Sequence, residues 1–311
     1  MASRFDDAAR AGWMYYVAGR TQDEIAAAMG ISRQSAQRLV SLAVSERLVK
    51  VRLDHPIAQC LELAEAMKAK FGLKFCEIVP SDPMNYSAAV GLAEAGAVEI
   101  ERWLRSPKPI VMAIGTGRTL KAAVDQLPNM SCPQHKIVSL TGNIGPDGSA
   151  AYYNVIFSMA EQVQARHFPM LLPVYVSSQE EREILHQQPM IRNSIALAKA
   201  ADVVFVGIGD VGLDAPLCMD GFVSKEEMVK LVADGAIGEI CGWLFDENGH
   251  LVQGSINNRV ASVPILRNKN VPGIALAMGQ HKHKAIRAAL RSGLVNGIIT
   301  DERAARFALE S

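Results

Sequence analysis

Residues 20–52, RTQDEIAAAMGISRQSAQRLVSLAVSERLVKVR, have the apolar spacing and the central glycine of two short helices that meet in a tight turn. Thr21 can cap the first helix while Glu24, three residues on, bonds back to the amide of the cap, which is a capping box. Gly30 supplies the backbone freedom that the reversal needs, and Ser32 is the expected cap of the second helix. The stretch predicts a helix-turn-helix.

The start of the second helix carries the side chains expected to meet DNA. An apolar stripe within residues 39–43 leaves the polar side chains before it on the outer face. Arginine and glutamine can make bidentate contacts to guanine and adenine edges, and the first part of a recognition helix enters the major groove. Segment 33–52 is also positive, with five basic residues against one acid, and a short strand at 48–53 would bring Lys50 and Arg52 to the phosphates. The predicted DNA-binding residues are Thr21, Arg33, Gln34, Ser35, Gln37, Arg38, Lys50 and Arg52. The alternative is an ordinary pair of surface helices.

The composition is that of a globular protein in which DNA binding is expected to be confined to one domain. The 311 residues are 49% hydrophobic and 21% charged, which is enough chain for about two domains. Basic and acidic residues balance at 32 each, which argues against a nucleic-acid-coated surface over the whole molecule. The cysteines form no CxxC pair and are predicted to be reduced, mostly buried thiols. Without a signal peptide or an apolar run of about 18 residues, a cytoplasmic protein with no membrane partner is expected.

A second, larger domain is expected after His55-Pro56, because the residue before a proline disfavours helix and a new helical period begins at residue 57. The predicted division is a helix-turn-helix DNA-binding domain over residues 1–55 and an effector-binding and oligomerisation domain over residues 56–311. A helix at 57–71 would link the two, a common place for a dimer contact.

From residue 74 onward, short apolar or β-branched runs alternate with helical ones. This alternation predicts an α/β fold with a doubly wound, mostly parallel sheet that has helices on both faces. The strands are expected at 75–79, 110–114, 136–140, 171–176, 203–208, 274–278 and 297–300. The helices are expected at 88–104, 119–127, 153–166, 191–200, 225–233 and 282–292.

The sharpest ligand-binding candidate is the loop GTGRT at residues 115–119, which follows the predicted strand 110–114 and opens a helix. Ligands of parallel α/β sheets bind beyond the carboxyl ends of the strands. A glycine turn at a helix N-terminus offers free amides and the helix dipole to an anion, and Arg118 adds a full positive charge. The loop therefore predicts a site for phosphate or a polar sugar. The alternative is a plain turn that closes a βα unit.

Other loops are expected at the same edge of the sheet. TGNIG at 141–145 contains Asn143, and GIGDVG at 207–212 contains Asp210. Glu239 and Lys282 lie in two further loops. A carboxylate would accept hydrogen bonds from sugar hydroxyls, and an ammonium group would pair with a phosphate or carboxylate. Either charge could instead belong to a solvated loop.

Several other kinds of site are not expected. GIGDVG matches GxGxxG, but the residues after it do not begin a helix and no acid ends a strand about 20 residues on, so no dinucleotide or other cofactor is predicted. His281 and His283 would lie on different faces of a helix start, so no metal is predicted. No nucleophile elbow, HExxH or P-loop occurs, and no catalytic residues are predicted.

Five segments in order resemble the SorC family of bacterial sugar-responsive transcriptional regulators, and the resemblance runs over nearly the whole chain. They are TQDEIAAAMGISRQSAQRLVSLA, GTGRTL, ADVVFVGIGDVG, GAIGEICGWLFDENG and AIRAALRSGLVNGIITDERAA. The resemblance implies a DNA-binding domain joined to an effector domain similar to glucosamine-6-phosphate deaminases and ribose-5-phosphate isomerases, usually in a tetramer. It implies these effector-binding residues: Gly115, Thr116, Gly117, Arg118 and Thr119 in the sugar or phosphate loop, with Asn143, Asp210, Glu239 and Lys282 in the others. Met278 departs from the family, which often has the first glycine of a GGxxK pattern there.

The sequence thus predicts a transcriptional regulator of carbohydrate or polyol catabolism, not an enzyme. Its expected partners are operator DNA, a sugar, polyol or sugar-phosphate effector, and further copies of itself in a dimer or tetramer. The alternative is a sugar-phosphate isomerase or deaminase with an accessory N-terminal module, which would need a carboxylate and a histidine for proton transfer. Asp210 and Glu239 could supply carboxylates, but no histidine occupies a matching loop. A sugar-binding module that acts only through protein partners would leave the basic helix unexplained.

Overall fold

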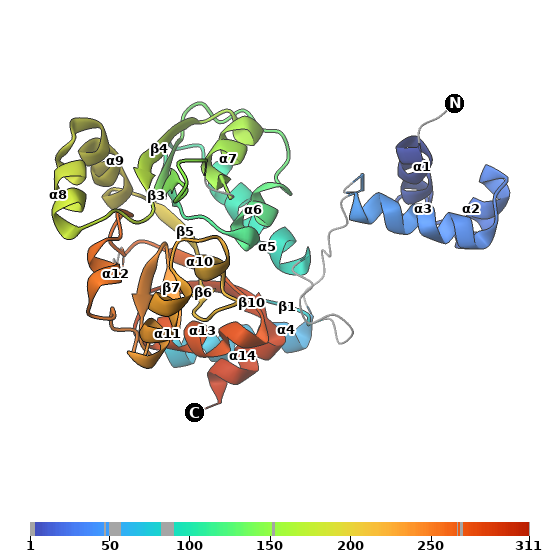
Figure 1. Cartoon of the computed structure of the whole chain (residues 1–311). Helices are drawn as coiled ribbons and strands as arrows, with labels where there is room; N and C mark the ends of the chain where they lie inside the picture. Colours follow the sequence, from blue (N-terminus) through green and yellow to red (C-terminus); the bar gives the residue numbers. More distant parts are fainter. Residues whose placement is uncertain are drawn as a thin grey trace. The chain divides into compact units, whose positions relative to one another are not determined.

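The chain divides into two compact units, Met1–Pro56 and Ile57–Ser311. The computed structural model describes residues 4–46, 48–49, 57–81, 90–150, 153–265, 267 and 270–310. Figure 1 colours the chain from the N-terminal unit in blue to the C-terminal helix in red. None of the described helices has the length and apolar character that a membrane span requires.

The N-terminal unit contains α1 (Arg4–Tyr16), α2 (Gln22–Met29) and α3 (Arg33–Ser45). Ile25 and Val40 pack with three alanines in its small core. The capping box is present, since the Thr21 amide donates to Glu24 Oε2 at 2.8 Å and the Glu24 amide donates to Thr21 Oγ1. Gly30 turns the chain with φ 67°, a left-handed conformation that favours glycine. Both helices and the turn between them lie where the sequence predicts them.

Helix α1 is not predicted by the sequence. Its buried residues are Ala8, Ala11 and Gly12, which are too small to give an apolar stripe. Most of the short strand predicted at 48–53 lies outside the described residues.

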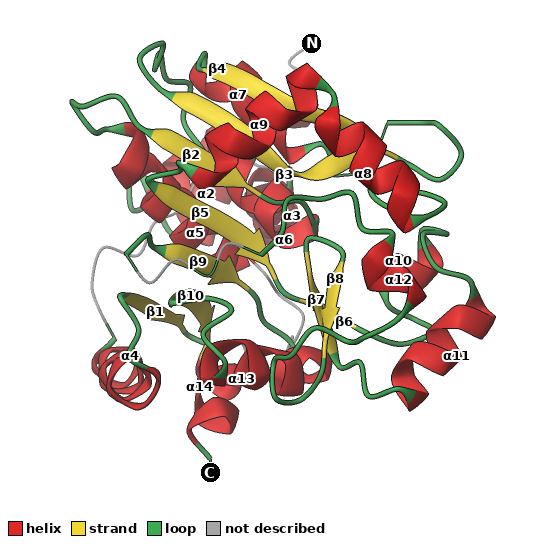
Figure 2. Ribbon diagram, turned by 90° about the vertical axis from the view of Figure 1, so that its left-hand side faces the viewer, coloured by secondary structure: helices red, strands yellow, loops and turns green. Residues whose placement is uncertain are grey.

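The C-terminal unit is built on a seven-stranded sheet in which every strand pair is parallel, as predicted (Figure 2). The strands follow the order β1-β10-β9-β5-β2-β3-β4. Their bounds are β1 (Phe75–Val79), β2 (Val111–Ile114), β3 (Lys136–Ile144), β4 (Arg166–Pro173), β5 (Val203–Gly207), β9 (Gly273–Leu276) and β10 (Gly297–Asp301).

Helices cover both faces of this sheet, because successive strand side chains point to opposite sides. Val204 of β5 packs in the cluster of α4 (Ala58–Phe71), α9 (Pro189–Lys199), α13 (His283–Arg291) and α14 (Glu302–Leu309). Phe205, the next residue, packs in the cluster of α5 (Val90–Leu104), α6 (Arg118–Val124) and α7 (Val155–Val163). The same alternation recurs in β2, β9 and β10, so both faces of the sheet are apolar and buried.

The strand order reverses between β5 and β2. From β2 the chain proceeds through β3 and β4 on one side, whereas β9 and β10 lie on the other side of β5. Loops after these two central strands diverge to opposite sides and leave a crevice at the carboxyl edge, where ligands of such sheets bind.

A smaller antiparallel sheet, which the sequence does not predict, lies beyond β5. It consists of β6 (Gly209–Asp210), β7 (Gly238–Ile240) and β8 (Trp243–Phe245). The helices α10 (Pro216–Met219), α11 (Lys225–Ala233) and α12 (Ser255–Asn258) accompany it, with an apolar cluster of their own. Glu239, which the sequence places in a loop, is therefore in the middle of β7.

Four helices of the C-terminal unit escape prediction: α8 (Gln179–Gln187), α14 and the short helices α10 and α12. α10 begins at Pro216, soon after GIGDVG, where no helix is expected from the sequence, but it has only four residues. α8 has no buried residue and so no apolar stripe, while the buried residues of α14 are alanines. The helix predicted at 153–166 ends instead at Val163, because Gln164 turns the chain with φ 49° and β4 starts at Arg166. All five cysteines lie in the described residues without a disulfide, and Cys60, Cys76 and Cys132 are buried.

Candidate functional site

The outer face of α3 begins with a run of polar side chains. Arg33, Gln34, Gln37 and Arg38 are exposed, whereas Ala36 and Val40 on the opposite side are buried in the core. Gln34, Gln37 and Arg38 are spaced i, i+3 and i+4, so they lie side by side on the helix surface. Among the described residues Arg33 pairs with Asp23, in a long and exposed contact with Nε to Oδ1 at 3.6 Å, which leaves its guanidinium accessible.

Other predicted DNA-binding side chains hold the local backbone instead. The Thr21 hydroxyl and amide are both engaged by Glu24 in the capping box. Ser32 Oγ accepts from the Ser35 amide at 3.2 Å and lies 2.9 Å from Ser35 Oγ, so both serines take part in the start of α3. These groups fix where α2 and α3 begin. Lys50 and Arg52 lie outside the described residues.

A cavity of about 520 Å³ opens at the carboxyl ends of β2 and β5, where the strand order reverses. Its walls come from the loop after β2, the loop after β5, strand β7 and the short helix η1 (Gln280–Lys282). Seven of the predicted effector residues line it: Thr116, Gly117, Arg118, Thr119, Asp210, Glu239 and Lys282. Segments up to 166 positions apart in the sequence therefore meet in one chamber.

Two predicted residues do not line the cavity. The Gly115 amide donates to the Phe205 carbonyl at 2.8 Å, which ties the end of β2 to β5. Asn143 is buried, and its Oδ1 accepts from the Met170 amide at 2.9 Å, at an irregularity in the pairing of β3 with β4. The structure thus gives Asn143 a role in holding the sheet together, because β3 continues past the expected loop.

Two carboxylates stand on one side of the cavity. Asp210 Oδ1 is buried with no hydrogen-bond partner among the described residues, and His281 Nε2 lies 3.9 Å from it. Glu239 Oε2 accepts from the Gly242 amide at 2.8 Å. A Cβ on Gly209 would collide with the Glu239 carboxylate, so a larger residue at this position would displace that side chain.

The charges in the cavity influence one another. Burial raises the pKa of Glu239 above its usual value, and the Gly242 amide and the Lys282 charge oppose that rise. Burial lowers the pKa of Lys282, while Asp210 and Glu239 raise it again. Arg118 adds a second cation that disfavours charge on Lys282. A ligand with several hydroxyls and an anionic group would complement both the carboxylates and the cations of this cavity.

The sequence does not identify several residues of the cavity wall. Tyr153 lines the wall, and its carbonyl accepts a hydrogen bond at 2.5 Å from Thr116 Oγ1, so the hydroxyl of this predicted residue is already engaged. Asp220 and Phe222 line the wall from a loop that follows no strand of the large sheet, and no sequence signal marks them. His281 is considered in the sequence only as a metal ligand, whereas the fold brings its Nε2 to 3.9 Å from Asp210 Oδ1. Among the described residues, no group of three His, Cys, Asp or Glu could hold a metal ion.

The chain matches a known protein family over residues 55–310, described as "Putative sugar-binding domain". It is 32% identical to the erythritol catabolism regulatory protein EryD of Brucella abortus over 299 residues, which cover 96% of this chain and 95% of that protein. It is 30% identical to the transcriptional regulator LsrR of Enterobacter sp. over 311 residues, which cover 97% and 92%.

Solved structures share the fold. The full-length sorbitol operon regulator SorC of Klebsiella pneumoniae superposes with a TM-score of 0.73 at 24% identity, and the match covers 100% of both chains. A DeoR family transcriptional regulator of Listeria monocytogenes gives a TM-score of 0.72 at 22% identity, covering 80% of this chain and 99% of that one.

Proposed function

Because this chain belongs to the SorC family of sugar-binding transcriptional regulators, we propose that α3 binds operator DNA and that a sugar, polyol or sugar phosphate in the cavity controls this binding. The chain is a transcriptional regulator and not an enzyme, as are its relatives EryD and LsrR. The effector class is the finer part of the proposal. EryD is named for erythritol catabolism, and the cavity of this chain has the chemistry for a molecule of that kind.

The observation that carries the proposal is the buried, unpartnered Asp210 Oδ1 in a cavity that also holds Glu239, Lys282 and Arg118. A buried carboxylate oxygen without a donor is costly, and a hydroxyl group from a ligand would remove that cost. Two or more ligand hydroxyls can donate to Asp210 and Glu239 while Arg118 and Lys282 neutralise an anionic end. Polyols and sugar phosphates supply that combination, which apolar or purely cationic molecules lack.

Control of DNA binding requires that the effector bind two arrangements of the protein with unequal affinity. Asp210 and Glu239 lie on neighbouring strands of the small sheet, and Lys282 lies on η1. A ligand that bridges these elements would favour one relative placement of them. In a homo-oligomer, a dimer or a tetramer, two copies of α3 would contact two operator half-sites. The effector would change the fraction of molecules in which both copies are placed to bind. A protein that binds operator DNA would act in the cytoplasm, where that DNA lies.

The test is fluorescence anisotropy of the purified protein on labelled DNA from upstream of its own gene, titrated with sugars, polyols and their phosphates. We expect specific binding that one compound shifts. Arg38→Ala and Gln34→Ala should each weaken operator binding by about tenfold, since a base contact contributes about 1–3 kcal/mol, and leave effector binding unchanged. Retained operator affinity in both variants would remove the recognition face from α3.

A second pair of variants tests the cavity. Asp210→Asn removes the charge but keeps the shape, and should weaken the effector by about 10- to 100-fold, because hydrogen bonds to a charged group contribute about 1.5–3 kcal/mol. Asp214→Asn is the matched control, as Asp214 is an exposed acid four residues away that does not line the cavity. Equal effector affinity in the two variants would place the ligand elsewhere.

A further inference from the structure

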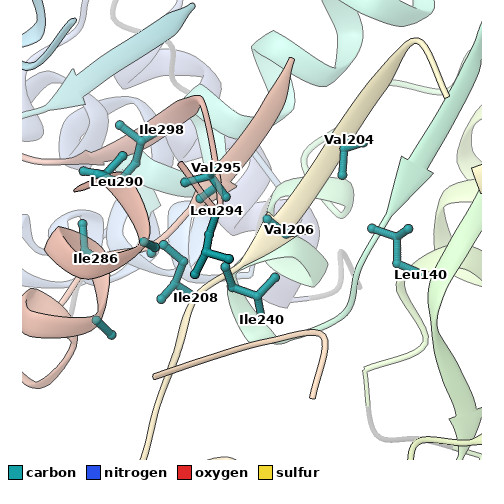
Figure 3. Close-up of a cluster of buried hydrophobic side chains, with 14 of the residues drawn as sticks. Leu140, Val204, Val206, Ile208, Ile240, Ile286, Leu290, Leu294, Val295 and Ile298 are labelled. Carbon is teal, nitrogen blue, oxygen red and sulfur yellow. The ribbon is translucent and has the colours of Figure 1, made fainter. Parts of the chain in front are cut away.

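A second, larger cavity lies at the opposite edge of the parallel sheet from the effector cavity. It has a volume of about 850 Å³ and opens at the amino ends of β5 and β9, between the C-terminal ends of α9 and α13. Val204, Ile265, Leu294 and Val295 give it an apolar floor. Figure 3 shows Val204 on β5 with Leu294 and Val295 in the segment that follows α13. We refer to this cavity as the basic groove.

The rim of the basic groove is positively charged. Lys74, Lys199, Arg267 and Arg291 line it, and no acidic residue is among its described lining residues. Arg267 donates to the Gly249 carbonyl at 3.1 Å. Within the described ranges, no carboxylate forms an ion pair with Lys74, Lys199 or Arg291, and all three are exposed. A partner for this groove must therefore combine negative charge with an apolar side chain.

Helix α8 has that combination on its outer face. Glu180, Glu183, Ile184 and Gln187 are spaced i, i+3, i+4 and i+7, and all four are exposed. Ile184 is 60% exposed, and Met190 just beyond the helix is 62% exposed. The other side of α8 holds it to the body of the unit, where His186 Nε2 lies 2.8 Å from the Ala261 carbonyl oxygen. The chain as a whole is neutral, so its basic groove is balanced by acidic surfaces such as this one.

We propose that the basic groove receives α8 of a second copy of this chain, in a two-fold symmetric contact. The proposal deepens the homo-oligomer of the proposed function by naming its interface. α8 leads through Gln188 directly into α9, and both helices are labelled in Figure 2. The groove begins at the end of α9, beside Ala198 and Lys199. An 11-residue helix is about 16 Å long. When two α9 helices lie antiparallel, α8 of each copy comes over the groove of the other, which is the self-complementary contact of a symmetric dimer.

Charge reversal on each side tests this pairing, with association of the full-length chain measured by sedimentation equilibrium over a range of concentrations. Lys199→Glu with Arg291→Glu should raise the dissociation constant of the contact by about tenfold for each reversed charge. Glu180→Lys with Glu183→Lys should weaken it similarly. The variant with all four changes should associate like the unmodified chain, because the opposite charges then face one another again. High salt should reduce the differences among these variants.

The matched control is Lys225→Glu with Lys230→Glu on α11, a helix outside the proposed contact, where association should not change. The proposal is wrong if the unmodified chain is monomeric at every concentration, or if neither double variant associates more weakly than the unmodified chain. It is also wrong if the groove variant dissociates but is not restored by the changes on α8, since another acidic surface would then occupy the groove.

The outcome is separable from the effector proposal. None of the altered residues lines the effector cavity, so all variants should bind the effector as the unmodified chain does. Thermal shift with the effector panel measures this directly. If the charge changes do not alter association while the variants still bind the effector, only the proposed interface is wrong. If they alter association as predicted but no compound of the panel binds, only the effector proposal is wrong.

Discussion

Glu77 should make the C-terminal unit less stable as the pH rises through the weakly acidic range. It lies on β1, paired in register with Ile299 of β10, and has no ion pair among the described residues. Burial raises the pKa of Glu77 from 4.5 to about 6, and the nearby charge of Glu99 adds to the rise. Glu99 itself accepts hydrogen bonds from the Arg102 guanidinium and the Trp103 indole.

The sign follows from proton linkage. The folded chain holds the Glu77 proton more tightly than the unfolded chain, so the free energy of unfolding falls as the pH rises from 4.5 to about 6. A pKa difference of about 1.5 corresponds to about 2 kcal/mol, at 1.36 kcal/mol for each unit. Glu77→Gln keeps the shape and stays neutral. Above about pH 6.5 the variant should therefore be more stable than the unmodified chain by up to about 2 kcal/mol, and near pH 4 the two should be alike.

Urea unfolding at a series of pH values measures this difference. Glu62→Gln is the matched control, because Glu62 is an exposed acid on α4 and its removal should leave the pH dependence unchanged. The reasoning is refuted if Glu77→Gln and the unmodified chain differ by the same amount at pH 4 and pH 7.5, or if the variant is the less stable at the higher pH.

Three other changes test local features. Thr21→Ala removes the capping box and should lower the unfolding free energy of the N-terminal unit by about 1 kcal/mol in thermal melts, with Thr21→Ser close to the unmodified chain. Gly209→Ala should displace the Glu239 carboxylate and weaken the effector in a titration while the melting temperature stays near its original value, and a large drop in melting temperature would contradict this. Asn257→Ala leaves the amide and carbonyl of Leu244 without their side-chain partner and should cost about 2–4 kcal/mol in urea unfolding, whereas a loss below about 1 kcal/mol would mean that water replaces the side chain.

Most strands of the large sheet could be predicted because both faces of a parallel sheet are buried, so that a strand is a continuous apolar run that differs from the helices between. β4 is the exception: predicted at 171–176, it spans Arg166–Pro173, because it lies at the edge of the sheet and its first residues are exposed or only partly buried. The same logic fails for α8, which buries nothing, and for α1 and α14, whose buried faces are alanine and glycine. A helix is visible in a sequence only when it buries large side chains on one face.

The candidate site divides in the same way. GTGRT could be identified because a strand, a glycine turn and a helix N-terminus follow one another within ten residues. Asn143 shows where this reasoning fails, because a polar residue in a glycine-containing segment indicates a ligand-binding loop. In the fold β3 runs on through it, and the side chain bonds to Met170 of β4.

The sequence by itself determined the features that rest on neighbours along the chain. These are the capping box at Thr21, the left-handed turn at Gly30, and the succession of strand, glycine turn and helix at GTGRT. The capping hydrogen bonds and the dihedral angle of Gly30 involve residues at most a few positions apart. Only the tertiary structure decided that Asp210, Glu239 and Lys282 share a cavity, that Asp210 Oδ1 has no donor there, and that burial shifts the pKa of Glu239 upward. Burial and charge depend on which atoms surround a group, and in this fold those atoms come from segments far apart in the sequence.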